Sequence, residues 1–197
     1  MRRTLGPIAA GSTLLIVAVG APLATATPAG RGHVDPAITQ SYTCRTPLGD
    51  LGLAGRVTGK ASIEGSTITL KKVKYAVTNA AGLSLTLDHI KVWTPDPASK
   101  AAKYKSDSVK VAGSPAGWKA GHDAGGVFAS FAGSQTVNDG DDLTVAALSA
   151  TYKAKGASGT VVDFHPGPVT FHVSQPISGD VTCTPDEPVG TFASVTE

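Results

Sequence analysis

The chain has 197 residues, of which 41% are hydrophobic, 16% are charged and 6% are aromatic, and its formal net charge is +2. This length suits one domain with a single core, and the ordinary hydrophobic content excludes a disordered chain. Without Arg2 and Arg3, 15 of the 17 basic residues remain and equal the 15 acidic residues, so the rest of the chain has no net charge. A neutral chain has no broad electrostatic attraction to nucleic acid or anionic lipid.

The N-terminus predicts a secretory signal peptide. Arg2 and Arg3 precede an apolar stretch at residues 14–21, and Ala24-Thr25-Ala26 supplies small residues in an A-x-A spacing. The stretch is too short to span a bilayer, which takes about 20 residues. We expect cleavage after Ala26 and no membrane span in the mature chain. We expect export by the general secretion route, and Arg2-Arg3 also permits the twin-arginine route.

Four segments follow from composition and patterning. Residues 1–26 form the leader, residues 27–37 a flexible Gly- and Pro-rich tail, residues 38–185 the folded domain and residues 186–197 a second tail, although Val189, Phe192 and Val195 could dock. Within the domain, turn signals recur about every ten residues and apolar side chains alternate with polar ones, which indicates an all-β fold. We expect strands near residues 38–44, 52–63, 67–78, 83–93, 108–112, 127–131, 143–153, 160–164, 169–174 and 180–183.

The clearest local pattern surrounds residue 80. Alternation of apolar residues breaks phase at Lys71-Lys72 and again at Asp88-His89. Folding the chain at Ala80 places every apolar residue of one strand opposite an apolar residue of the other, so we expect an antiparallel hairpin, with a bulge or sharp bend at the phase breaks. The predicted pairs are Val77 with Leu83, Tyr75 with Leu85, Val73 with Leu87, Leu70 with Ile90, and Ile68 with Val92.

A Gly-rich stretch at residues 117–126 contains Trp118, His122 and Asp123. We interpret it as a flexible loop and as the candidate ligand-contact loop, because binding residues concentrate on loops and exposed aromatic side chains anchor ligands. For Trp118 itself we favour packing over one end of the fold, because large aromatic side chains are usually mostly buried. A catalytic role for His122 and Asp123 is not expected, since no G-x-S-x-G motif or free cysteine accompanies them.

Each of two other polar clusters could bind a metal ion or could simply lie at a turn. Asn138-Asp139-Gly140-Asp141-Asp142 could bind calcium, but it lacks the EF-hand spacing, and Asp-Gly is a tight-hairpin signal. Asp163, His165 and His172 could converge on a metal if residues 160–174 form a hairpin. The alternative is two exposed histidines beside a turn. We expect no functional metal site, because Pro166 and Pro168 restrict the loop between the histidines.

Cys44 and Cys183 are the two cysteines, and an even number in an exported chain predicts a disulfide; two buried free thiols are the alternative. A proline follows each cysteine closely and would end its strand, so we expect the first and last strands to be neighbours, joined at one end. Closing a loop of about 140 residues would stabilise the fold by about 5 kcal/mol in the chain-entropy account.

Several short segments resemble small secreted two-cysteine β-sandwich proteins of actinobacteria. The resemblance rests on Tyr42-Thr43-Cys44, the Thr-Pro-Leu-Gly continuation at residues 46–49, short strands rich in Thr and Val, and the closing Val181-Thr182-Cys183. It implies a fold and a compartment, and it carries no catalytic or binding residues. True immunoglobulin domains place a Trp soon after the first cysteine, whereas Trp93 follows Cys44 by about fifty residues.

We therefore expect an antiparallel β-sandwich of about eight to ten short strands, Ig-like in architecture, with one disulfide. The sequence shows no nucleophile motif, no paired-carboxylate signature and no cofactor loop. The expected function is a secreted, non-enzymatic domain that binds or scaffolds in the envelope or extracellular space, with no cofactor and an unidentified partner. The alternative is a small secreted hydrolase or metal-dependent enzyme. A cavity lined by His or Asp would favour the enzyme, and a filled core with surface loops would favour the binder.

Overall fold

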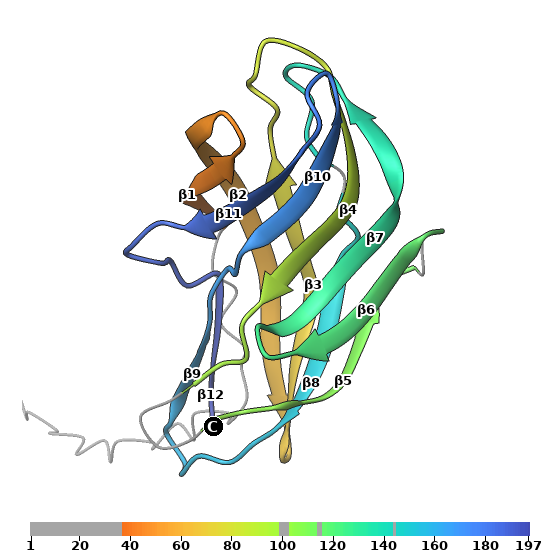
Figure 1. The fold of residues 1–197 in the computed structure, drawn as a ribbon. Helices are drawn as coiled ribbons and strands as arrows, with labels where there is room; N and C mark the ends of the chain where they lie inside the picture. Colours follow the sequence, from red (N-terminus) through yellow and green to blue (C-terminus); the bar gives the residue numbers. More distant parts are fainter. Residues whose placement is uncertain (1–36, 99–102, 114–115, 144) are drawn as a thin grey trace, which may run out of the picture.

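The computed structural model describes residues 37–98, 103–113, 116–143 and 145–197 (Figure 1). The expected signal peptide, and the expected N-terminal tail except its last residue, lie outside these ranges. The described chain forms twelve strands: β1 (Ile38–Thr46), β2 (Gly49–Glu64), β3 (Thr67–Val77), β4 (Leu85–Thr94), β5 (Ser106–Val111), β6 (Trp118–Asp123), β7 (Gly126–Val137), β8 (Leu148–Lys153), β9 (Val161–Phe164), β10 (Val169–Gln175), β11 (Gly179–Pro185) and β12 (Ala193–Thr196). Across the described part of the chain, no helix is long and apolar enough to cross a membrane.

Ten of the strands form a single antiparallel sheet in the order β5-β8-β3-β2-β1-β11-β10-β4-β7-β6, and β9 pairs with β12 in a separate two-stranded sheet. The large sheet curves until its edge strands, β5 and β6, come into contact. The all-β, antiparallel class is therefore confirmed. One strongly curved sheet with a small companion differs from the two packed sheets of the expected sandwich.

The predicted hairpin between residues 67–78 and 83–93 is wrong. Strand β3 pairs with β2 and β8, and β4 pairs with β10 and β7, so Tyr75 does not lie opposite Leu85. Both strands turn their apolar side chains toward the same core, which is why their patterns match. The two strands meet across the core, where the Tyr75 hydroxyl donates a hydrogen bond of 2.7 Å to the carbonyl of Trp93.

The predicted irregularities at the phase breaks are confirmed, although the strands pair elsewhere. Lys72 and His89 adopt φ values of 54° and 49°, which non-glycine residues rarely do. The ladders shift register at the same places, between Leu70 and Val73 and between Asp88 and Ile90. These bulges change which face a side chain occupies and bend the sheet, so they help it curve around one core.

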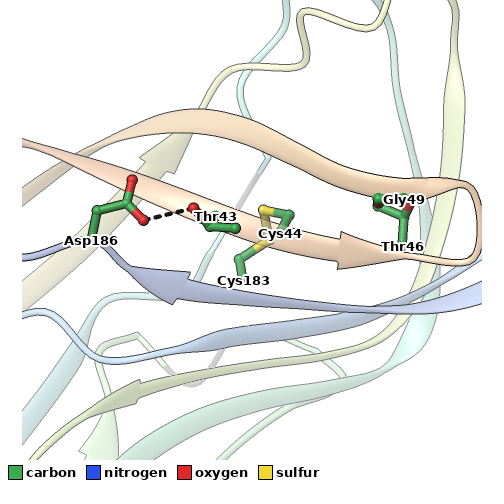
Figure 2. The surroundings of a disulfide bond; sticks show 6 residues. All are labelled: Thr43, Cys44, Thr46, Gly49, Cys183 and Asp186. Atoms are coloured by element: carbon green, nitrogen blue, oxygen red, sulfur yellow. Dashed lines mark hydrogen bonds between the residues drawn. A yellow bond between two sulfur atoms is a disulfide. The ribbon is translucent and has the colours of Figure 1, made fainter.

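The predicted disulfide is confirmed: Cys44 of β1 is bonded to Cys183 of β11, and the two residues lie directly opposite each other in the register (Figure 2). Beside it, the Thr43 hydroxyl donates a 2.8 Å hydrogen bond to the Asp186 carboxylate. The pairing of β1 with β11 lies at the middle of the strand order, with five strands on each side. The disulfide therefore joins the two halves of the sheet.

The C-terminal residues are part of the fold, which corrects the expectation of a tail at 186–197. Strand β12 pairs with β9, and Phe192 and Val195 are fully or almost fully buried. Phe192 lies over Gly59 of β2 so closely that a β-carbon at position 59 would come within 2.6 Å of the ring. The absence of a side chain at Gly59 thus makes room for the C-terminal segment.

Candidate functional site

An apolar cavity of about 510 Å³ lies at the end of the large sheet where three connections meet. These are the β1–β2 turn, the β3–β4 connection and the β10–β11 turn, which are close together in the upper part of Figure 1. Leu48, Leu51, Leu83 and Ile177 line it and are also exposed, Leu48 to 78% and Ile177 to 54%. In the described part of the chain only one other large hydrophobic side chain, Val161, is similarly exposed.

The β1–β2 turn holds Leu48 outward by local hydrogen bonds. The Thr46 hydroxyl donates to the carbonyl of Gly49 (2.7 Å) and accepts from the amide of Leu48 (3.2 Å). Gly49 has a φ of 121°, a conformation that other residues rarely adopt. The turn is therefore fixed by its own residues, and Leu48 is presented at the mouth of the cavity.

The β3–β4 connection is held in a similar way by Asn79, which is buried. Its amide nitrogen donates to the carbonyls of Leu83 and Val137 (2.9 Å each), and its oxygen accepts from the amide of Ala81 (3.0 Å). An Asn at the start of a connection often hydrogen-bonds the backbone two residues later. This bracing shapes one wall of the cavity.

The acidic segment at residues 138–142 supports the same wall. Asp139 accepts a hydrogen bond from the amide of Gly82 (2.8 Å), and Asp142 accepts one from the hydroxyl of Thr78 (2.6 Å). The expected turn is present, with Gly140 at a φ of 81°. It does not close a hairpin, because β7 and β8 pair with other strands.

The cavity wall offers apolar surface and few polar atoms. Among its described lining residues, only Thr46, Thr78 and Asn79 have polar side chains, and none is charged. At its inner end, Cys44, Leu53 and Phe171 also border a void of about 10 Å³ that reaches Tyr42 and Cys183. Burial raises the pKa of the Tyr42 hydroxyl far above its usual value. The cavity is thus open between the turns, and on the side of this void it is bordered by buried residues.

The segment expected to be a flexible ligand-contact loop is instead a hairpin of β6 and β7. Trp118 stacks on Phe131, with ring centroids 5.3 Å apart, and His122 Nε2 lies 2.5 Å from Asp96 Oδ2. None of Trp118, His122 and Asp123 lines the cavity. Trp118 therefore packs on the fold, as favoured from the sequence.

Asp123 is the centre of a small polar network on this hairpin. Its carboxylate accepts hydrogen bonds from Lys91 Nζ (2.7 Å), Trp93 Nε1 (3.0 Å) and the amide of Gly125 (2.8 Å). Desolvation opposes ionisation of Asp123, but the hydrogen bonds from Lys91, Gly125 and Trp93 outweigh it and hold the pKa of this carboxyl below its usual value. These contacts tie the edge strand β6 to β4.

Asp163, His165 and His172 do not converge, because β9 and β10 do not pair with each other. His165 Nδ1 lies 3.1 Å from the carbonyl oxygen of Gly190, and His172 lies on β10 beside β11. Over residues 37–197, leaving aside the undescribed gaps, no three His, Cys, Asp or Glu side chains form a group that could hold a metal ion.

His172 has two polar neighbours that the sequence interpretation missed. Its Nδ1 lies 2.8 Å from Asp180 Oδ1, and its Nε2 lies 3.1 Å from Ser178 Oγ. This is the order of contacts in a Ser-His-Asp triad. Ser178 lies between Ile177 and Gly179, both of which line the cavity. The Asp180 side chain is 92% exposed, however, so water screens its effect on the imidazole.

The cavity itself was also missed, although the sequence held a signal for it. Apolar residues occur inside two of the predicted turns, at Pro47-Leu48 and at Pro176-Ile177, where polar residues are usual.

No protein-family model, curated protein or solved structure matches the chain. The chemistry of the cavity is therefore inferred from its own residues.

Proposed function

We propose that this protein is a secreted, non-enzymatic domain that binds an apolar small molecule in the cavity at the end of the large sheet. The observation that carries the proposal is an open cavity of about 510 Å³ whose described wall is almost entirely hydrocarbon and carries no charge. Binding sites for small molecules typically have volumes of about 300–1,000 Å³ and mainly hydrophobic walls.

The exposed side chains at the mouth support the same proposal. Large hydrophobic residues gathered in one exposed place commonly mark a binding site, whereas single ones are ordinary. Leu48 and Ile177 lie in two turns that are far apart in the sequence and Leu51 lies at the start of β2, yet all three line one opening. A ligand in the cavity would cover part of this surface and remove it from water.

The residues lining the cavity favour a binder over an enzyme. A His or Asp in the wall is the feature that would favour catalysis, and no described lining residue is either. A disulfide between positions 139 residues apart is compatible with a protein that folds in an oxidising compartment, such as the envelope or the extracellular space.

Titration of the purified protein with N-phenyl-1-naphthylamine, a neutral apolar fluorophore, tests the proposal. We expect a saturable rise in fluorescence with one site per chain. Leu51→Asp, at the mouth, should weaken binding at least tenfold, because it places a charge against the apolar ligand. The matched control is Val161→Asp, at a side chain that is similarly exposed (52%, against 48% for Leu51) but lies outside the cavity. A fluorescence rise that does not saturate, or equal binding by both variants, would refute the proposal.

A second candidate function, a small secreted hydrolase, is favoured by the contacts of His172 with Ser178 and Asp180. In that mechanism His172 Nε2 takes the proton of Ser178 while Ser178 Oγ attacks an ester carbonyl. The imidazolium then gives this proton to the alcohol that leaves as the ester C–O bond breaks, and water hydrolyses the resulting acyl-enzyme. The test is labelling with an alkyl fluorophosphonate, read by mass spectrometry. A label on Ser178 that is lost in His172→Ala would support the hydrolase, and an unlabelled Ser178 would remove this candidate.

A further inference from the structure

We infer that the ligand is a single-chain amphiphile, whose hydrocarbon tail fills the cavity and whose polar head stays at the mouth. The inference rests on the proposed binding function and specifies the class of molecule. Three features of the described cavity carry it: the engaged donors of its wall, its one buried end and the exposed, water-screened charges beside its mouth.

The polar side chains of the wall have no hydrogen left to donate to a ligand. The hydroxyl of Thr46 donates to Gly49, and the hydroxyl of Thr78 donates to Asp142. Both amide hydrogens of Asn79 go to backbone carbonyls. A polar group buried in the cavity would leave water without receiving a side-chain hydrogen bond in return, which is costly. The buried part of the ligand is therefore hydrocarbon.

The shape of the cavity places any polar group of the ligand at one end. The mouth is open between the turns, whereas at the other end Cys44 and Phe171 separate the cavity from a void of only about 10 Å³, beyond which Tyr42 is buried. Such a void is at or below the size needed to hold one water molecule. A ligand with one polar end and a hydrocarbon tail fits this geometry, and the buried end sets a maximum length for the tail.

The charged side chains beside the mouth do not select the charge of the head. Arg45 and Asp50 flank this turn and lie directly opposite each other in the register of β1 and β2. Both are exposed, as are Asp139 and Asp142 beside the β3–β4 connection, so water solvates an ionic head and screens it from these side chains. The tail, rather than the head, should therefore determine affinity.

Calorimetric titration with a series of amphiphiles tests the inference. Their tails are octyl, decyl, dodecyl and tetradecyl chains, and each tail is joined to a carboxylate, trimethylammonium or maltoside head. Each amphiphile is used below its critical micelle concentration. Each added methylene should tighten binding by about fourfold, the value for burying one CH₂ group. The gain should stop once the tail reaches the buried end. At equal chain length the three heads should agree within about fivefold, as expected for solvated charges.

Leu51→Asp should weaken binding of every chain, and Val161→Asp should leave the series unchanged. If N-phenyl-1-naphthylamine binds but affinity shows no dependence on chain length, or follows the head instead, the inference fails while the proposed binding function stands. If neither the fluorophore nor any chain binds, the proposed function fails as well.

Discussion

At the scale of single residues, the Tyr75 hydroxyl holds the core together where β3 and β4 meet. It donates to the carbonyl of Trp93, accepts from the amide of Gly167 (3.3 Å) and lies 3.2 Å from the Thr94 hydroxyl. Desolvation raises its pKa to about 12, although the hydrogen bonds of Thr94 and Gly167 act in the opposite direction. Tyr75→Phe should lower the free energy of unfolding in urea by about 1–3 kcal/mol, because buried partners are left unsatisfied.

Tyr42→Phe is the matched control for that prediction. The Tyr42 hydroxyl is also buried, but it has no hydrogen-bond partner in the described part of the chain. Removing it deletes a desolvated polar atom without breaking a bond, so stability should stay equal or rise. Equal losses in Tyr42→Phe and Tyr75→Phe would show that removing a buried hydroxyl, and not breaking the hydrogen bonds of Tyr75, accounts for the effect.

At the scale of elements, alternation predicts strands well where side chains point alternately into the core. Residues 67–78, for example, were expected to form a strand, and β3 covers Thr67–Val77. Strand β6 lacks this pattern because Gly121 lies under the ring of Phe128, so that an aromatic residue of the neighbouring strand covers a position without a side chain. Strand β12 has only four residues and follows a Pro- and Gly-containing stretch, which is why it resembled a tail.

Pairing could not be predicted from the same signal. Two strands that face one core must both be apolar on that face, whether they are neighbours or lie across from each other. The apparent register of Tyr75 with Leu85 reflected this shared core. For the same reason the cavity could not be predicted, because it depends on which turns meet at one end of the sheet. The triad-like group of His172, Ser178 and Asp180 could not be predicted either, because it forms only through the pairing of β10 with β11.

The packing of the C-terminal segment gives a prediction at this scale. Phe192 is fully buried over Gly59, and β12 completes the small sheet. Phe192→Ala should lower the free energy of unfolding by about 3–5 kcal/mol, the usual cost of truncating a buried Phe. Thr196→Ala, at an exposed position of β12, should change it by less than about 0.5 kcal/mol. If both variants unfold like the unmodified protein, the segment behaves as a tail.

At the scale of the whole molecule, the large sheet consists of two five-stranded halves that meet where β1 pairs with β11. Four residue pairs make this contact, whereas β1 and β2 share nine. The two halves are further tied by the loops and side chains of the common core, such as the contact of Tyr75 with Trp93. The backbone pairing between the halves is thus short, and it contains the one covalent cross-link.

The Cys44–Cys183 bond should therefore contribute strongly to stability. Replacing both cysteines by alanine should lower the free energy of unfolding by about 2–5 kcal/mol, since a cross-link over 139 residues removes much of the freedom of the unfolded chain. Thr43→Ala, which removes only the exposed hydrogen bond to Asp186, should cost less than about 1 kcal/mol. A thiol count on the unfolded, unreduced protein should find no free thiol, and two would contradict the bond.

The way in which the free energy of unfolding depends on urea concentration shows whether the disulfide acts on the folded or the unfolded state. If the bond works by restricting the unfolded chain, the alanine double variant unfolds to a more expanded state that exposes more surface. Its free energy of unfolding should then fall more steeply with urea, because that slope scales with the surface exposed. A loss of stability with an unchanged slope would instead mean that the bond acts mainly in the folded state, by holding β1 against β11 where the two halves of the sheet meet.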